Sequence, residues 1–352
     1  MAKAVYVGVN SKARKMKKAY IGIGGKARKV KKMYIGVGGK ARLCYSAELE
    51  KVGMATALST TRYDMRAATV GKYALFAGGY ISKSPLGYSV GSSVDAYNTS
   101  LTKSTPTELS CKRCGHAAAS VGGYALFAGG RRNNGLFTMS QSAVDAYNTS
   151  LTRTTATPLP SNAYACAGGT VGGYAVFSGG CDMNSDSTLV ETIGALEIVR
   201  AYDSSLTSSQ AAPLSCPRAV HSAATIGNHL LFAGGYNSTT GKYLSTVESY
   251  DASLTRSTAV ELSSAKNGLA SATVGEYAMF AGGYKGNSDA TYVATVDAYN
   301  TALTKTTMPD LSVGRYGLAS AVIGDYALFA GGISKISSTA EQYQDVVDVY
   351  SA

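Results

Sequence analysis

Five cations recur at one position of a repeated sequence and together could hold an anion. Each stands a few residues before an apolar run in this chain of 352 residues. A ring of such cations would suit an acidic peptide, a sialylated glycan or an anionic polymer. The alternative is that each one pairs with backbone carbonyls or with a neighbouring carboxylate. The five are Arg62, Arg113, Arg218, Lys266 and Arg315, and the sixth copy of the position is Ala163.

A second candidate surface comes from the segments in which the repeats differ most. These segments are rich in Tyr, Ser, Gly and Asn, as in YISKSPLGYSVGSS at 80–93. Tyrosine offers a large contact area at low entropic cost, and the small polar residues offer adaptable hydrogen bonds. Since variable loops on a uniform scaffold often carry binding, we predict a ligand-binding face here. The candidate contact residues are Tyr80, Arg131, Arg132, Tyr236 and Tyr284.

Other reactive residues do not assemble into a recognisable catalytic or metal-binding motif. Cys111-Lys-Arg-Cys114-Gly-His116 supplies half of a zinc site, but a structural site needs four ligands and no second half follows. The chain has three histidines without a motif-based triad partner, and no phosphate-binding or dinucleotide fingerprint. We therefore expect no metal, no cofactor and no enzymatic activity.

The charge is divided unevenly along the chain. The net charge is +11, yet residues 1–47 hold 13 of the 33 basic residues and no acidic residue. The remainder carries 20 basic against 22 acidic residues and is nearly neutral. The N-terminus lacks the apolar core of a signal peptide, and no run approaches the roughly 18 apolar residues of a membrane span. We expect free thiols, synthesis in the cytoplasm and no membrane insertion.

Internal repeats define the larger part of the chain. A double glycine follows an apolar run six times, as in YALFAGG, and ends at Gly79, Gly130, Gly180, Gly235, Gly283 and Gly332. A V-x-x-Y marker such as VDAY follows each double glycine. Each unit reads as four short strands, for example Gly115–Val121, Tyr124–Ala128, Ala143–Tyr147 and Leu151–Thr157.

The last unit stops after its third strand, and the missing strand precedes the first unit. Leu49–Ser59 aligns with Leu303–Ser312, allowing one extra residue. An N-terminal strand that completes the last blade closes a propeller ring and hides its edges. We therefore predict an all-β fold over residues 48–352, a six-bladed β-propeller closed by an N-terminal strand.

The basic head has its own period of 14 residues. An alternating run, a two-residue turn and a basic run recur three times, which predicts three β-hairpins within residues 1–47. The head is the candidate attachment module, with docking on another protein favoured over a solvated surface and over nucleic-acid binding. Its candidate contact residues are Tyr6, Tyr20, Tyr34, Lys26, Arg28, Lys40 and Arg42.

The repeats resemble the kelch family in their period near 50, in the double glycine and in V-x-x-Y. The resemblance covers residues 48–352 and implies a kelch-like propeller in which the five cations lie beside the central channel, on the face of the variable loops. One departure is that Ser104, Thr154 and Thr306 stand where the family carries tryptophan on the outer strand.

The head resembles N-terminal segments of tail-associated structural proteins encoded by prophages of gut bacteria. That resemblance implies a virion-associated protein whose head docks on phage structural proteins and whose propeller loops bind a host-surface glycan or protein. Two alternatives stay open: an intracellular scaffold that binds acidic peptides through the cation ring, and a propeller enzyme acting on sugars. A homo-oligomer is also possible.

Overall fold

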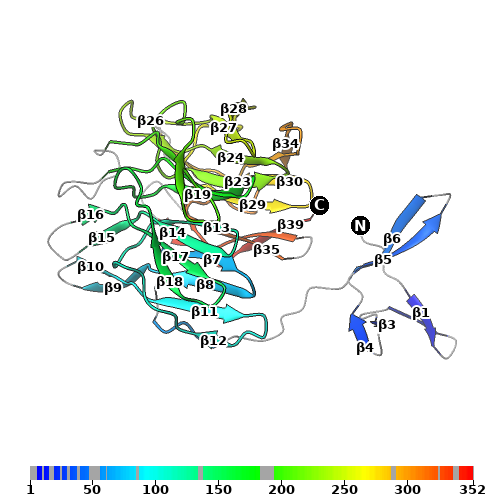
Figure 1. Cartoon of the computed structure of the whole chain (residues 1–352). Helices are drawn as coiled ribbons and strands as arrows, with labels where there is room; N and C mark the ends of the chain where they lie inside the picture. Colours follow the sequence, from blue (N-terminus) through cyan, green and yellow to red (C-terminus); the bar gives the residue numbers. More distant parts are fainter. Residues whose placement is uncertain are drawn as a thin grey trace. The chain divides into compact units, whose positions relative to one another are not determined.

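The computed structural model of the chain consists of β-strands joined by turns and loops (Figure 1). It describes residues 6–9, 12–15, 20–23, 26–29, 32–37, 40–46, 56–60, 62–84, 87–133, 138–182, 194–286, 291–323, 326–335 and 341–351. These residues include no helix that is long and apolar enough to cross a membrane. The chain divides into two compact units, Met1–Ala55 and Thr56–Ala352.

The first unit contains three antiparallel hairpins, as the 14-residue period predicts. Their registers repeat: Val7 lies opposite Arg14, Ile21 opposite Arg28, and Ile35 opposite Arg42. The predicted turn residues fall outside the described part of the chain. The hairpins are β1 (Tyr6–Val9) with β2 (Lys12–Lys15), β3 (Tyr20–Ile23) with β4 (Lys26–Lys29), and β5 (Lys32–Val37) with β6 (Lys40–Ser46).

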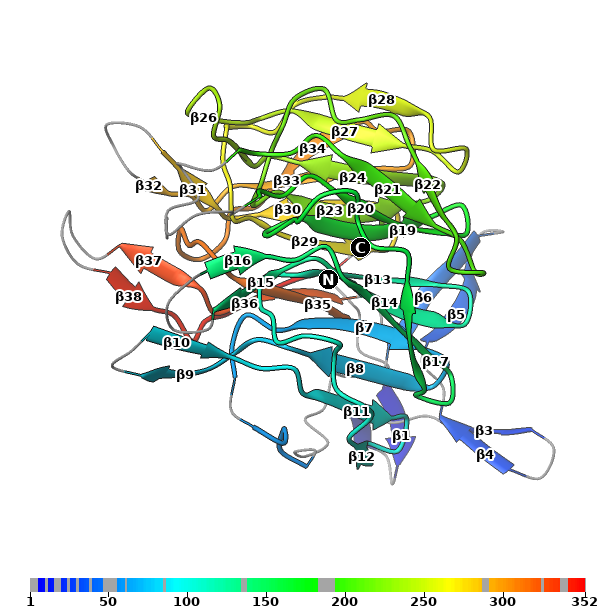
Figure 2. The same cartoon turned by 60° about the vertical axis from the view of Figure 1, so that its left-hand side comes forward.

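The second unit is a six-bladed propeller of antiparallel sheets, and the inner strands of consecutive blades from 1 to 6 contact one another (Figure 2). Blade 1 holds β7 (Arg66–Val70), β8 (Tyr73–Ala77), β11 (Val94–Asn98) and β12 (Lys103–Ser104). Blade 2 holds β13 (Ala117–Val121), β14 (Tyr124–Ala128), β17 (Val144–Asn148) and β18 (Arg153–Ala156). Blade 3 holds β19 (Ala167–Val171), β20 (Tyr174–Ser178), β21 (Val199–Tyr202) and β22 (Ser208–Gln210).

The remaining blades follow the same order from the inner to the outer strand. Blade 4 holds β23 (Ser222–Ile226), β24 (His229–Ala233), β27 (Val247–Tyr250) and β28 (Arg256–Ala259). Blade 5 holds β29 (Ala270–Val274), β30 (Tyr277–Ala281), β33 (Val296–Tyr299) and β34 (Lys305–Met308). Blade 6 is described with three strands, β35 (Ala319–Ile323), β36 (Tyr326–Ala330) and β39 (Val347–Ser351).

Small hairpins connect the second and third strands of five blades and project on one side of the propeller, here called the hairpin face (Figures 1 and 2). In blade 3 the described part of this connection is a bridge between Cys181 and Ala195. The hairpins are β9 (Tyr80–Ser84) with β10 (Gly87–Val90), β15 (Arg131–Asn133) with β16 (Thr138–Ser140), β25 (Tyr236–Asn237) with β26 (Lys242–Tyr243), β31 (Tyr284–Lys285) with β32 (Thr291–Tyr292), and β37 (Ile333–Lys335) with β38 (Glu341–Tyr343).

The apolar run before each double glycine forms a strand that is covered on both faces. In β14, the side chains from Ala125 to Ala128 are fully buried between blades. The strand ends where Gly129 and Gly130 take left-handed φ angles of +70° and +99°. A Cβ on Gly129 would lie 2.4 Å from the carbonyl oxygen of Ala163, so no larger residue fits this approach.

Inner strands of neighbouring blades are joined by side-chain hydroxyls that donate to backbone carbonyls. Ser120 donates to the carbonyl of Thr69 at 2.6 Å, and Thr170 donates to that of Ser120 at 2.7 Å. The series continues from blade to blade and couples adjacent sheets without any regular strand pairing. Its further members are Thr225 to Thr170, Thr273 to Thr225, and Ser320 to Ser271.

A leucine from the turn after each third strand packs into the preceding blade. Leu206, for example, lies against the core shared by blades 2 and 3. These leucines have φ angles between 58° and 63°, a conformation that costs an L-residue about 1–2 kcal/mol. The packed leucines are Leu151, Leu206, Leu254 and Leu303.

The junction between blades 6 and 1 differs from the other five. At the other junctions the hydroxyl of the later blade donates to the earlier one, so the donor position here is Thr69 of blade 1, which is exposed, and Val322 on the blade 6 side is 47% exposed. Val347 and Val349 of β39 are 48% and 52% exposed, and Leu101, the blade 1 counterpart of the packed leucines, is 51% exposed. Among the described residues, therefore, the sixth junction lacks the contacts that join the others.

The predicted closing strand, Leu49–Ser59, lies mostly outside the described residues. Its last part is described and confirms the register of the alignment. The Ser59 amide donates to the Asp95 carboxylate at 3.2 Å, as the Ser312 amide donates to Asp348 at 3.1 Å. Thr56–Thr60 thus lies on blade 1 in the same way as the segments that connect one blade to the next, here called the crossing segments, lie on later blades.

Candidate functional site

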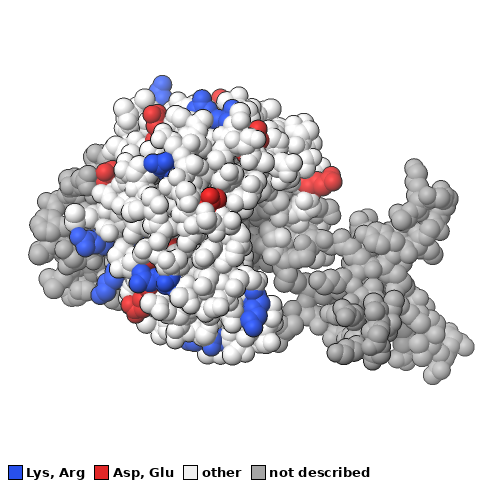
Figure 3. Space-filling view, in the orientation of Figure 1, with Lys and Arg blue, Asp and Glu red and all other residues white. Residues whose placement is uncertain are grey.

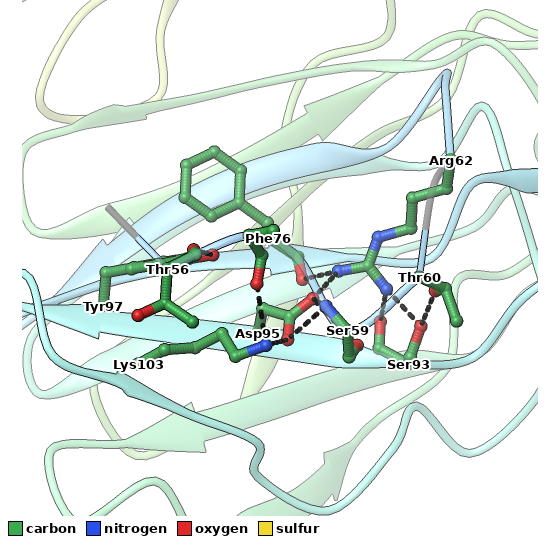
Figure 4. A network of polar contacts seen from close by, with 10 residues as sticks. Thr56, Ser59, Thr60, Arg62, Phe76, Ser93, Asp95, Tyr97 and Lys103 are labelled. Carbon is green, nitrogen blue, oxygen red and sulfur yellow. Dashed lines mark hydrogen bonds and ion pairs between the residues drawn. The ribbon is translucent and has the colours of Figure 1, made fainter. Parts of the chain in front are cut away.

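The five predicted cations form buried clamps within the blades. In blade 1, the Arg62 guanidinium donates to Asp95 at 2.7 Å and to the carbonyl of Phe76 at 3.0 Å (Figure 4). Both charged side chains are 0% exposed. The same carboxylate also accepts hydrogen bonds from Ser59, so the clamp fixes the crossing segment to the third strand of the blade.

The clamp recurs in every blade except blade 3. There Ala163 replaces the cation and Arg200 replaces the acid, so both partners are absent together. Burial is the main cause that lowers the pKa of Lys266, and Asp297 partly opposes it. The other clamps are Arg113 with Asp145 at 2.6 Å, Arg218 with Glu248 at 2.5 Å, Lys266 with Asp297 at 3.6 Å, and Arg315 with Asp348.

These contacts correct the prediction of an anion-binding ring. The cationic side chains are fully shielded from solvent and already neutralised by carboxylates, so they present no charge to a ligand. The alternative, pairing with carbonyls and carboxylates, describes what these residues do. The residues that fail as ligand contacts are Arg62, Arg113, Arg218, Lys266 and Arg315.

The hairpin face carries a ring of six residue pairs, here called the rim pairs. In each, the residue after the double glycine bridges the residue after the clamp position. Tyr63 and Tyr80, for example, exchange two backbone hydrogen bonds at 3.0 and 2.8 Å, so their side chains lie on the same side. The rim pairs are Tyr63–Tyr80, Cys114–Arg131, Tyr164–Cys181, Ala219–Tyr236, Asn267–Tyr284 and Tyr316–Ile333.

Blades 1 to 3 give the rim a cationic side. The Arg131 guanidinium lies 4.3 Å from the centre of the Tyr164 ring and 5.6 Å from that of Tyr80, and it also donates to the Tyr80 hydroxyl. The Tyr63 ring stacks on Tyr80 at 4.9 Å. Arg132 is exposed on the other side of β15. The rim here therefore offers one half-buried cation, Arg131.

Blades 4 to 6 give the rim an uncharged aromatic side, here called the tyrosine cluster. Its rings touch in sequence: Tyr236 with Tyr243 at 5.0 Å, then Tyr243 with Tyr284 at 5.5 Å. Tyr284 in turn lies 5.6 Å from Tyr292, which stacks at 6.1 Å on Tyr316. Five rings from three blades thus make one surface, and all but Tyr236 are half-buried.

Sequence reasoning found four of the twelve residues in the rim pairs. These are Tyr80, Arg131, Tyr236 and Tyr284, whereas Arg132 is on the opposite side of β15 from Arg131. It missed all six residues that directly follow the clamp position in each repeat. That fixed spacing was the available signal. The missed aromatic members of the rim pairs are Tyr63, Tyr164 and Tyr316.

The cysteines and histidines of the described propeller residues are placed apart from the rim pairs or buried. No group of three or more His, Cys, Asp or Glu is placed to hold a metal ion in the part of the chain that the structure describes. Cys111 and Cys114 are free thiols, and His116 is fully buried with no hydrogen-bond partner on either ring nitrogen. Burial lowers the pKa of His221 to about 3, and it hydrogen-bonds to Ser178 at 2.8 Å.

An apolar cavity of about 190 Å³ lies at the opposite end of blade 5 from the hairpins. Val274, Tyr277 and Met308 contribute to its wall. Leu151, Leu206, Leu254 and Leu303 pack at the corresponding places of blades 1 to 4, so the cavity belongs to blade packing rather than to the hairpin face.

The attachment candidates of the head are placed by strand and register. Tyr6, Tyr20 and Tyr34 lie on the first strand of each hairpin, and the four cations lie on the second strands of the later two. In β3 and β4, Tyr20 lies opposite Lys29. The cations concerned are Lys26, Arg28, Lys40 and Arg42.

Comparisons with known proteins support the fold. A model of the Kelch motif matches residues 217–253, which run from the clamp of blade 4 to the turn after its third strand. The solved structure described as "Structure of YjhT" is similar with a TM-score of 0.62, covering 84% of this chain and 96% of that chain at 14% identity. The structural likeness supports the propeller fold, and the Kelch motif is matched in blade 4. No curated protein sequence matches the chain.

Proposed function

We propose that this chain is a virion-associated binding protein of a phage or prophage. The propeller contacts a glycan or protein on the host surface through the hairpin face, and residues 1–47 attach it to structural proteins of the particle. The single observation that carries the binding role is the tyrosine cluster, because five contacting rings on one face form a large and rigid contact surface.

The surface charge supports recognition by shape and aromatic contact. On the side shown in Figure 3, the described Lys, Arg, Asp and Glu residues are scattered over a largely uncharged surface. The acidic-peptide alternative needed the five clamp cations, and these are buried.

The attachment role rests on the head sequence and its regular register. Each hairpin places an aliphatic residue opposite an arginine: Val7 with Arg14, Ile21 with Arg28, and Ile35 with Arg42. A repeated pattern of basic residues of this kind suits an acidic protein partner.

The test separates the two roles. Mass spectrometry of purified particles should find the chain at a fixed copy number, and the labelled full-length protein should bind intact host cells. Reversing four head charges, with Lys26→Glu, Arg28→Glu, Lys40→Glu and Arg42→Glu, should remove the chain from particles without changing cell binding. Absence from particles together with no cell binding would refute the proposal.

A further inference from the structure

We propose that the tyrosine cluster is a binding site for a neutral hexopyranose unit. This inference rests on the proposed function and narrows its ligand to uncharged sugar. The site consists of Tyr243, Tyr284, Tyr292 and Tyr316 with the side-chain amide of Asn267.

The rings are held in place before any ligand arrives. Tyr284 contacts three other rings, at 5.5 Å to Tyr243, 5.6 Å to Tyr292 and 6.2 Å to Tyr316. These contacts join hairpins of blades 4 and 5 to the crossing segment of blade 6. A surface whose side chains are already ordered loses little conformational entropy when it binds.

Two glycines make room for the rings. A Cβ on Gly268 would lie 2.0 Å from the Tyr316 ring, and a Cβ on Gly286 would lie 1.8 Å from the Tyr243 ring. Gly268 has a φ of +60°, but Ala165 and Val220 take +56° at the equivalent position. The backbone angle therefore does not require this glycine, whereas the ring that lies on it does.

The same pairing of a glycine with a tyrosine ring of the next blade appears on the other side of the rim. Gly115 occupies the equivalent position in blade 2, and its Cβ would lie 2.3 Å from the Tyr164 ring of blade 3. Ala165 and Val220 are followed in the next blade by Ala219 and Asn267, which carry no ring. Glycine thus accompanies tyrosine, and the flat placement of these rings is encoded in the repeats.

The chemistry of the cluster suits the apolar face of a pyranose ring. The axial C–H bonds of a hexose carry slight positive charge and complement the negative face of an aromatic ring. The half-buried Asn267 lies beside Tyr284, with which it exchanges two backbone hydrogen bonds, and its buried Oδ1 accepts no hydrogen bond. Since Oδ1 has almost no exposed surface, a sugar hydroxyl satisfies this acceptor only when the Asn267 side chain turns outward.

The ligand is neutral because the charge lies elsewhere on the rim. The five residues of the site carry no formal charge at neutral pH, and Lys285 alternates with Tyr284 along β31, so it points to the other side of the strand. Arg131, the rim cation, belongs to blade 2. An acidic sugar would find its counter-charge there and not among these tyrosines.

The test is saturation-transfer difference NMR with the full chain and four probes. These are methyl α-D-glucopyranoside, methyl β-D-galactopyranoside, methyl α-D-mannopyranoside and N-acetylglucosamine. We expect saturation of at least one probe to be strongest on the C–H protons of one ring face. Since the chain has 25 tyrosines and no tryptophan, the same binding should perturb tyrosine absorbance directly.

Matched variants assign the site. Tyr292→Ala and Tyr316→Ala should each weaken binding at least tenfold, and Asn267→Ala should weaken it severalfold. Tyr316→Phe keeps the ring and should bind nearly as well as the unchanged protein, which controls for misfolding. Tyr63→Ala removes a 54% exposed tyrosine of blade 1 and should leave binding unchanged.

The outcomes also separate this inference from the proposed function. If the protein binds host cells but none of the four sugars, or if Tyr63→Ala abolishes sugar binding, the neutral-sugar site is refuted and a protein receptor or the Arg131 side takes its place. If sugars bind through Tyr292 and Tyr316 but the chain is absent from particles, the sugar site stands and the virion role fails.

Discussion

Five junctions between blades are built alike, and the sixth is not. From blade 1 to blade 6, each junction has a hydroxyl-to-carbonyl bond between inner strands, such as Ser120 to Thr69 at 2.6 Å. Each also has a backbone bond between left-handed residues, such as Gly115 to Asp64 at 3.4 Å. Neither bond joins blade 6 to blade 1 within the described residues, and Val322 and Val349 remain about half exposed there.

The difference teaches that residue types alone do not make a junction. The blade 1 side keeps the residue types of its counterparts, with Thr69 at the hydroxyl position and Leu101 at the position of the packed leucines. Leu101 is nevertheless 51% exposed, whereas Leu206 is packed. The same residue type therefore contributes differently at different junctions, and the following predictions test that contrast.

The largest effect should come from breaking a clamp between closed junctions. Asp145→Ala leaves the Arg113 charge buried without its carboxylate, which we expect to cost about 3–5 kcal/mol in the free energy of unfolding, measured by chemical denaturation. Asp348→Ala, in blade 6, should cost less because that carboxylate is 17% exposed. Equal losses would show that the two blades are equally enclosed. The double replacement Arg113→Met with Asp145→Leu should recover most of the loss.

A glycine pair separates ring packing from backbone strain. Gly268→Ala and Gly317→Ala both place alanine at a φ near +60°, so the backbone cost is shared. Only Gly268 has a ring where the new Cβ must go, since nothing lies within 4 Å of a Cβ on Gly317. We expect Gly268→Ala to be less stable by about 1–3 kcal/mol in thermal and chemical denaturation. Identical stabilities would mean that Tyr63 covers Gly317 in solution.

Two leucines compare the closed and open junctions directly. Leu206→Ala removes a side chain packed between blades 2 and 3 and should lower the free energy of unfolding by about 1–2 kcal/mol. Leu101→Ala, at a 51% exposed position, should change it by less than about 0.5 kcal/mol. A large effect at Leu101, seen in the same denaturation series, would contradict an open sixth junction.

Acid should weaken the junctions that contain histidine. Burial, followed by the nearby Arg218 charge, lowers the pKa of His221 to about 3, and burial lowers that of His116 well below its ordinary value near 6.5. The unfolded chain therefore takes up these protons first, so their stabilising contribution is complete above pH 6.5 and is lost as the pH falls below it. At pH 5.5 each histidine should cost about 1 kcal/mol.

Leucine variants measure that acid effect. His116→Leu and His221→Leu should each reduce the fall in melting temperature between pH 7.5 and 5.5. At the sixth junction the equivalent residue is Met65, which does not titrate. If the melting temperature of both variants falls with pH as steeply as that of the unchanged protein, the histidines are not buried in their neutral form.

The sequence predicted the propeller well because its repeats are local. The double glycine and V-x-x-Y mark the second and third strands of each blade directly, and predicted strands such as Tyr124–Ala128 coincide with observed ones. The pairing of each clamp cation with a carboxylate could also be proposed from residue types. The sequence could not show which arginine side chains are exposed. Arg113 and Arg131 are the same residue type in neighbouring parts of one repeat, but only Arg113 is fully buried.

The rest of the site depends on contacts between distant residues. Tyr164 lies on Gly115, and Tyr316 lies on Gly268, across separations of about one repeat. Without the order of strands in space, a tyrosine after the clamp position and a glycine in the previous repeat have no evident relation. The open junction was hidden for the same reason, because Val322 resembles any other strand valine until its neighbour is known.

The backbone bonds between left-handed residues give the ring a built-in set of reporters. The amides of Gly115, Ala165, Val220, Gly268 and Gly317 each donate to the equivalent residue one blade earlier. Each of these protons therefore belongs to one junction alone, and its exchange with solvent measures how often that junction opens. Five amides followed in one spectrum would rank the junctions by opening frequency, and the amide of Asp64 would report whether the sixth ever closes.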